Sequence, residues 1–185
     1  MALTKTPVCD FGKKAKDFKL KSINNKVISL NDIKGEKATL IMFICNHCPY
    51  VKAIIKDLAK DCNELKKDGI NSVAIMSNDT KNYPEDSFEN MIKFADNNSF
   101  GEINYLFDET QEIAKKYGAV CTPDFFGYNK DLSLQYRGRF RELKDLKPVN
   151  NGDSDLKIAM KIVAQTQKGP DQQIPSMGCN IKWFN

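Results

Sequence analysis

The sequence has little of several features that mark common protein classes. It contains one histidine and one tryptophan among 185 residues, and its formal net charge is only +4. The lysines are spread along the chain, so no basic patch indicates nucleic-acid binding. No apolar run is long enough to span a membrane, and the polar, lysine-dotted opening over residues 1–16 lacks the apolar core of a secretory signal. We therefore expect a cytoplasmic protein with neither a membrane nor a nucleic-acid partner.

The chain also lacks internal repeats, low-complexity segments and any linker long enough to divide it. A chain of this length can bury roughly 70% of its unfolded surface as one domain. We expect a single domain over residues 1–185, with a core over about 15–166. Glycines and prolines interrupt every period in residues 167–185, which predicts an irregular tail.

A second close pair of cysteines is also missing. The six cysteines are Cys9, Cys45, Cys48, Cys62, Cys121 and Cys179. In a reducing compartment, one close pair beside a strand–helix pattern is more often catalytic or metal-binding than structural. A structural zinc site would need a second pair. Copper binding is a minor alternative, in which Cys121 or Cys179 would have to supply a third ligand because no second histidine exists. We expect no metal or other cofactor.

The close pair is the segment Cys45-Asn46-His47-Cys48. It follows a largely apolar run over 38–44, which is typical of a strand covered on both faces. After it, apolar side chains form one helical stripe: Val51, Ile54, Ile55, Leu58, Cys62 and Leu65. With Asn46 as the N-cap, both thiols lie on one face of the first helical turn. The unpaired N–H groups there favour the thiolate of Cys45. This predicts a redox dithiol with Cys45 as the nucleophile and Cys48 as the resolving thiol.

The only histidine, His47, falls inside this pair. An ordinary thiol with a pKa of about 8.5 is about 3% thiolate at pH 7, whereas a pKa of about 6.5 would make it roughly 75% thiolate. That shift is worth about 2.7 kcal/mol, and a helix terminus supplies only ~0.3–1 kcal/mol, or up to ~2 in a partly buried site. We expect the His47 imidazolium to stabilise the Cys45 thiolate. The alternative is a surface histidine without such a role.

The rest of the pattern alternates strand and helix. We expect an N-terminal hairpin from strands over 16–20 and 27–30, and a buried strand over 70–76. Further elements are expected as a helix over 84–97, a strand over 103–107, a short helix from the cap Asp108 to Tyr117, a hairpin from 125–128 and 132–137, and a helix over 154–165. Cys62 lies on the apolar helix stripe and is expected in the core.

Thr122-Pro123 lies downstream of the pair, directly before the second predicted hairpin. With the dithiol, it resembles the thioredoxin superfamily, in which a cis proline, often preceded by threonine, faces the dithiol. The opening segment 15–20 and the extra strand and helix before Thr122 are similar to its peroxiredoxin-like branch, called alkyl hydroperoxide reductase/thiol-specific antioxidant. The resemblance covers roughly 15–165. It implies an α/β thioredoxin-like fold, a central mixed sheet flanked by helices, with Thr122, Pro123 and Cys121 near the substrate.

The function implied is that of a thiol–disulfide oxidoreductase of the antioxidant, redox-homeostasis type. The alternative is a peroxiredoxin-like thiol peroxidase; on the peroxiredoxin register Cys48 takes the peroxidatic place and Cys45 that of the usual threonine. The substrate would be a protein or small-molecule disulfide, or a hydroperoxide, and a thioredoxin-type system would return the enzyme to its reduced form. Cys179 would be an extra resolving thiol if the tail folded back onto the site; we expect a tail that stays away from the dithiol.

Overall fold

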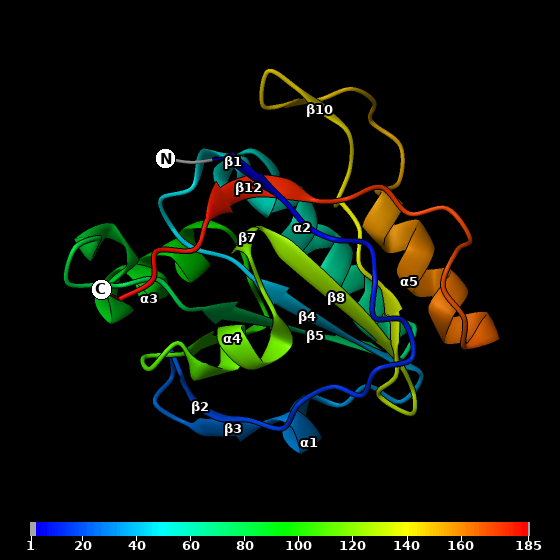
Figure 1. Cartoon of the computed structure of the whole chain (residues 1–185), viewed down its shortest axis with the longest axis horizontal. Coiled ribbons are helices and arrows are strands. Elements are labelled where there is room, and N and C mark those ends of the chain that lie inside the picture. Colours follow the sequence, from blue (N-terminus) through cyan, green and yellow to red (C-terminus); the bar gives the residue numbers. More distant parts are fainter. Residues whose placement is uncertain (1–2, 185) are drawn as a thin grey trace.

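A seven-stranded mixed sheet lies at the centre of the computed structural model, which describes residues 3–184 (Figure 1). The strands follow the spatial order β3 (Val27–Ser29), β2 (Lys19–Ser22), β6 (Asn104–Phe107), β5 (Ile70–Met76), β4 (Ala38–Phe43), β8 (Asp124–Asn129) and β9 (Leu134–Tyr136). Strand β5 is parallel to both β4 and β6, and the other pairs are antiparallel. The predicted N-terminal hairpin is confirmed as β2 and β3, and the predicted second hairpin as β8 and β9.

Helices cover both faces of this sheet. Their bounds are α1 (Leu30–Ile33), α2 (Pro49–Lys67), the 3₁₀ turn η1 (Pro84–Asp86), α3 (Phe88–Asn97), α4 (Glu112–Tyr117) and α5 (Asp155–Thr166). Side chains of α2, α3 and α5 share one core layer with Leu40 and Met42 of β4, whereas α1 and α4 share the other layer with Ile41 and Phe43. Strand β4 is therefore buried on both faces, as its continuous apolar run predicted.

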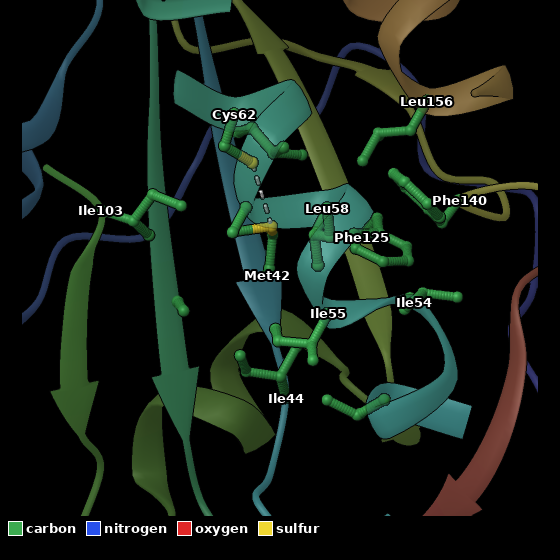
Figure 2. Close-up of a cluster of buried hydrophobic side chains, with 14 of the residues drawn as sticks. Met42, Ile44, Ile54, Ile55, Leu58, Cys62, Ile103, Phe125, Phe140 and Leu156 are labelled. Atoms are coloured by element: carbon green, nitrogen blue, oxygen red, sulfur yellow. Dashed lines mark hydrogen bonds between the residues drawn. The ribbon is translucent and has the colours of Figure 1, made fainter. Parts of the chain in front are cut away.

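The core layer under α2 determines where the dithiol lies. Figure 2 shows Ile55 and Leu58 of α2 packed toward Met42 and Ile44, with Phe125 of β8 beside them. Cys62 Sγ lies 4.0 Å from Met42 Sδ, and burial raises the pKa of Cys62 to about 12, so the predicted core role of this cysteine is confirmed. This packing holds the N-terminus of α2 at the carboxyl end of β4.

Local hydrogen bonds set several helix boundaries. The Asp108 carboxylate accepts hydrogen bonds from the backbone N–H groups of Ile113 (3.2 Å) and Ala114 (2.9 Å), so it caps α4 although that helix begins only at Glu112. The Ser154 side chain caps α5 by accepting a hydrogen bond from the Lys157 N–H group. The predicted helix over 84–97 is divided, because Ser87 has extended ψ and separates η1 from α3.

The predicted irregular tail is wrong for its central part. Residues Met177–Asn180 form strand β12, which lies between β1 (Leu3–Lys5) and β7 (Cys121–Thr122) in a separate three-stranded sheet (Figure 1). A four-residue strand is too short to show a hydrophobic period, and both of its partners are distant in sequence. Local patterns therefore could not reveal it.

A small hairpin, β10 (Leu143–Lys144) with β11 (Lys147–Pro148), projects from the body of the molecule beyond β9 (Figure 1). Within residues 3–184, no helix combines the length and apolar composition that a membrane span requires.

Candidate active site

The predicted dithiol lies in the turn between β4 and α2. Helix α2 begins at Pro49 with Cys48 as its N-cap, so the expected N-cap, Asn46, is wrong. Proline suits the first helical position because its missing N–H group would have no partner there. The Asn46 side chain instead accepts a hydrogen bond from the Tyr105 hydroxyl (2.9 Å) and donates one to the Glu85 carbonyl (3.1 Å).

The loop that carries Thr122 and Pro123 contacts both thiols. Cys45 Sγ lies 3.2 Å from Thr122 Oγ1, and Cys48 Sγ lies 3.1 Å from the Thr122 carbonyl oxygen. The peptide bond between Thr122 and Pro123 is cis, as the family resemblance predicted. The structure therefore brings the two predicted motifs together across 74 or more residues of sequence.

The two thiols differ in pKa, in the opposite order to that expected. Hydrogen bonding by the Cys45 side chain lowers the pKa of Cys48 well below its usual value, and contacts from Cys179 and the Val51 N–H group act in the same direction. Burial, together with hydrogen bonding to Cys48 and the nearby Asp86 charge, raises the pKa of Cys45. The helix begins two residues later than predicted, so Cys48 rather than Cys45 meets its N-terminus.

One contact opposes the Cys48 thiolate. The Thr122 carbonyl oxygen can accept a hydrogen bond only from the neutral thiol, so it favours the protonated form of Cys48. Several donors face the same sulfur, and together they outweigh this single acceptor.

His47 interacts with a carboxylate that the sequence analysis did not find. Its Nδ1 lies 2.7 Å from Asp86 Oδ2, and its ring stacks on Tyr83 at 5.6 Å between centroids. Hydrogen bonding to Asp86 raises the pKa of His47. Among residues 3–184, no hydrogen bond joins His47 to either sulfur. A ring nitrogen of His47 nevertheless lies within 4.8 Å of Cys45 Sγ, and stabilisation of the Cys45 thiolate by the imidazolium remains a prediction.

Asp86 organises the polar side of the site. Its carboxylate is fully buried and also accepts hydrogen bonds from the Asn46 backbone N–H (2.8 Å) and the Asn78 side-chain amide (2.8 Å). It comes from η1, 39 residues beyond His47. No spacing in the sequence marks it, because its partners are contributed by separate loops.

This carboxylate also bears on the minor copper hypothesis. Single ligand atoms of Cys45, His47 and Asp86 lie within 4.8 Å of one another. Both Asp86 oxygens already accept hydrogen bonds from His47, Asn46 and Asn78. His47 and Asp86 are therefore described by a hydrogen-bonded network centred on Asp86.

Cys179 reaches the dithiol. On β12 its Sγ lies 3.0 Å from Cys48 Sγ, so the expectation that the tail stays away from the site is wrong. Burial and the interaction with Cys48 raise the pKa of Cys179. The preceding residue, Gly178, permits the close approach, since a Cβ atom there would overlap the Thr122 carbonyl oxygen.

Cys121 is close to the site without contacting the dithiol. It is buried on β7 with its Sγ 3.6 Å from the Pro123 carbonyl oxygen, and burial raises its pKa. Its substrate-contact role remains a prediction.

A cleft of about 420 Å³ opens beside Pro123. The first two turns of α2 contribute Tyr50 and Ile54 to its wall, and the segment before β12 contributes Ile174 and Pro175. Its lining also includes the basic side chains Lys5, Arg139 and Arg141. A mainly apolar surface therefore adjoins the cis-proline loop.

Comparison with known proteins identifies the family. Residues 11–140 match the model of the AhpC/TSA family. The chain belongs to this family. It is an oxidoreductase of thiol chemistry with a thioredoxin-like fold. A comparison with curated proteins found no match.

Two solved structures resemble this AhpC/TSA protein over nearly its whole length. An uncharacterized conserved protein from Geobacillus kaustophilus is 39% identical with a TM-score of 0.94, over 100% of this chain and 97% of the other. A hypothetical protein from Sinorhizobium meliloti 1021 is 36% identical with a TM-score of 0.90, over 98% of each chain. The thioredoxin domain of a thiol-disulfide oxidoreductase from Bacteroides vulgatus shares the fold at 18% identity and a TM-score of 0.58, over 69% of this chain and 86% of that one.

Proposed function

We propose that this AhpC/TSA protein is a thiol–disulfide oxidoreductase in which Cys48 is the attacking thiolate and Cys45 closes the disulfide. The observation that carries the proposal is the position of Cys48 as the N-cap residue of α2, where unpaired N–H groups favour its thiolate; the lowered pKa of Cys48 and the raised pKa of Cys45 point in the same direction. This reverses the roles that the sequence predicted, while keeping the same pair.

The reaction proceeds in two exchange steps. The Cys48 thiolate attacks one sulfur of a substrate disulfide, whose S–S bond breaks, and the leaving thiolate takes a proton from solvent. In the mixed disulfide, Cys48 no longer carries the charge that raises the pKa of Cys45. Cys45 then loses its proton and attacks the Cys48 sulfur, which releases the second substrate thiol and leaves a Cys45–Cys48 disulfide. A thioredoxin-type reductant would return this disulfide to two thiols.

The position of the cleft supports a disulfide substrate with an apolar flank. Pro123 and Tyr50 line the cleft, and both neighbour residues that hold the two sulfurs. A substrate in this cleft would lie along the loop before Pro123, with its disulfide near Cys48. We expect the apolar walls of the cleft and its basic side chains Lys5, Arg139 and Arg141 to select the substrate together.

The test mixes reduced protein with oxidised glutathione and follows formation of the adduct by mass spectrometry. Cys48→Ser should abolish adduct formation, whereas Cys45→Ser should form the adduct on Cys48 at a near-normal rate. Cys9→Ser is the matched control, because Cys9 lies in a polar segment outside the site. A Cys48→Ser protein that reacts at the full rate would contradict the assignment.

A thiol peroxidase is the second candidate, and the ionised Cys48 in the peroxidatic place of the family favours it. The Cys48 thiolate would attack one peroxide oxygen, form a sulfenic acid and release hydroxide; Cys45 would then condense with it to give the same disulfide and water. A stopped-flow measurement of the rate of oxidation by hydrogen peroxide, with Trp183 fluorescence as the signal, distinguishes the two candidate functions. A rate far above that of free cysteine would establish the peroxidase, and a rate no higher would exclude it.

A further inference from the structure

We propose that Cys179 is a third redox-active thiol of this site, to which Cys48 transfers its disulfide bond from Cys45. The inference rests on the proposed function, because it uses the Cys45–Cys48 disulfide as its starting point. It adds a step and a residue that the two-cysteine motif does not contain.

The geometry places the third sulfur within bonding reach. Cys179 Sγ and Cys48 Sγ are separated by 3.0 Å, so only a small shift would bring them to the length of a disulfide. The Cys179 side chain is 4% exposed, and the two cysteines are 131 residues apart in sequence. The proximity is therefore a property of the folded chain rather than of a local motif.

The strand that carries Cys179 is held on both sides of it. Before it, the Thr6 backbone N–H donates to the Ser176 carbonyl at 2.9 Å; after it, the Asp79 N–H donates to the Lys182 carbonyl at 2.8 Å. Cys179 itself pairs with Thr122 in the sheet of β1, β12 and β7. These hydrogen bonds hold the Cys179 thiol in a fixed position next to Cys48.

The transfer is an isomerisation and needs no external oxidant. The Cys179 thiolate attacks Cys48 Sγ of the Cys45–Cys48 disulfide; the Cys48–Cys179 bond forms and the Cys45–Cys48 bond breaks. Cys45 leaves as a thiolate and takes up the proton that Cys179 lost. Thiols, disulfides and protons all balance.

Nearby charges favour this direction. In the disulfide Cys48 is neutral. Burial raises the pKa of both Cys45 and Cys179, so the two thiols differ in their neighbouring charges: the Asp86 carboxylate raises the pKa of Cys45 further, whereas Lys182 acts to lower that of Cys179. These charges favour a protonated Cys45 and a thiolate at Cys179.

Peptide mapping can locate the disulfide. Reduced protein is treated with one equivalent of oxidised glutathione, quenched in acid, alkylated and digested with trypsin. Cleavage after lysine puts Cys45 and Cys48 in one peptide, residues 38–52, and Cys179 in another, residues 169–182. A Cys48–Cys179 bond therefore joins two peptides, whereas a Cys45–Cys48 bond stays within one. Wild type, Cys45→Ser, Cys179→Ser and the control Cys9→Ser are compared, with circular dichroism as a check on folding.

We expect the cross-linked peptide pair in wild type, Cys45→Ser and Cys9→Ser, and its complete loss in Cys179→Ser. The relay is overturned if wild type lacks the cross-link, or if Cys45→Ser stops at a glutathione adduct on Cys48. That adduct would leave the proposed function standing. Absence of any adduct or disulfide at Cys48 in every variant would instead overturn the proposed function and the relay together.

Discussion

Cys45 and Cys48 are three residues apart, and their surroundings push their pKa values in opposite directions. Cys48 caps α2 and receives several hydrogen-bond donors, whereas Cys45 is enclosed and close to Asp86. Burial is the largest influence on Cys45, whereas at Cys48 hydrogen bonds outweigh burial. A motif of two cysteines therefore does not say which sulfur attacks; the residue at which the helix begins does.

The first prediction concerns the pH at which the site reacts. An ordinary cysteine, with a pKa of about 8.5, loses its thiolate as the pH falls below that value. Because the pKa of Cys48 is lowered, we expect iodoacetamide to alkylate it at an almost constant rate as the pH falls from 8.5 to 7. Peptide mapping of the alkylated protein gives the rate for each cysteine. A rate that falls about tenfold per pH unit over this range would contradict the assignment.

The second prediction concerns the only histidine. Asp86 raises the pKa of His47, so Asp86→Asn should lower it. The imidazole resonance in a proton NMR titration is unambiguous because the chain has one histidine. A raised pKa means that the pair stabilises the folded protein fully below pH 6.5 and that this contribution is lost as the pH rises through the folded value. An unchanged midpoint in Asp86→Asn would contradict the role of Asp86.

At the scale of elements, strand β12 determines which thiols meet. It joins the first strand of the chain to the segment before Pro123 and brings Cys179 against Cys48. Gly178 allows this approach, because its hydrogen leaves room for the Thr122 carbonyl. The packing of two backbones thus controls the distance between two sulfurs.

The third prediction follows from this packing. Gly178→Ala should force β12 away from β7 and lengthen the distance between Cys48 and Cys179. We expect at least a tenfold loss of the Cys48–Cys179 cross-link in the peptide map, with adduct formation at Cys48 retained. Gly152→Ala is the matched control, since a Cβ at Gly152 would meet only the Asn150 side chain at 3.8 Å. Equal cross-linking in both variants would contradict the steric argument.

At the scale of the whole molecule, a buried ion pair supports the region of the cis-proline loop. Arg137 Nη2 donates to Asp124 Oδ2 at 3.1 Å and to the Gly118 carbonyl at 2.8 Å. Both side chains are almost completely buried, and the guanidinium lies over the Phe126 ring. Desolvation by burial raises the pKa of Asp124 to about 6 even with this partner. Arg137 therefore lies in a buried ion pair rather than at a solvated end of β9.

The fourth prediction tests this pair. Arg137→Met should destabilise the protein by about 3–5 kcal/mol, because it leaves a buried carboxylate without its partner. The loss should be smaller at low pH, since protonation of Asp124 removes the buried charge. Urea unfolding at several pH values measures both effects. The control is Arg139→Met, whose partly exposed ion pairs with Asp155 and Glu142 should be worth about 0–1 kcal/mol. Equal losses in the two variants would contradict the argument.

Local sequence patterns predicted the regular elements well. The strand at Ile70–Met76 agrees at both ends, and the helix stripe after the dithiol corresponds to α2, although its start differs. These elements follow from hydrophobic period and helix capping, which act between residues a few positions apart. The short strand β12 has no such period.

The sequence by itself determined most of the strands and helices and the close cysteine pair near the start of a helix; the fold class was implied by a family resemblance. It did not determine which cysteine is ionised, that Asp86 binds His47, or that Cys179 lies against Cys48. The first group depends on interactions between near neighbours in the chain, and these leave a periodic pattern. The second depends on contacts between segments 39 to 131 residues apart, and only the packing of β12, η1 and α2 brings those atoms together.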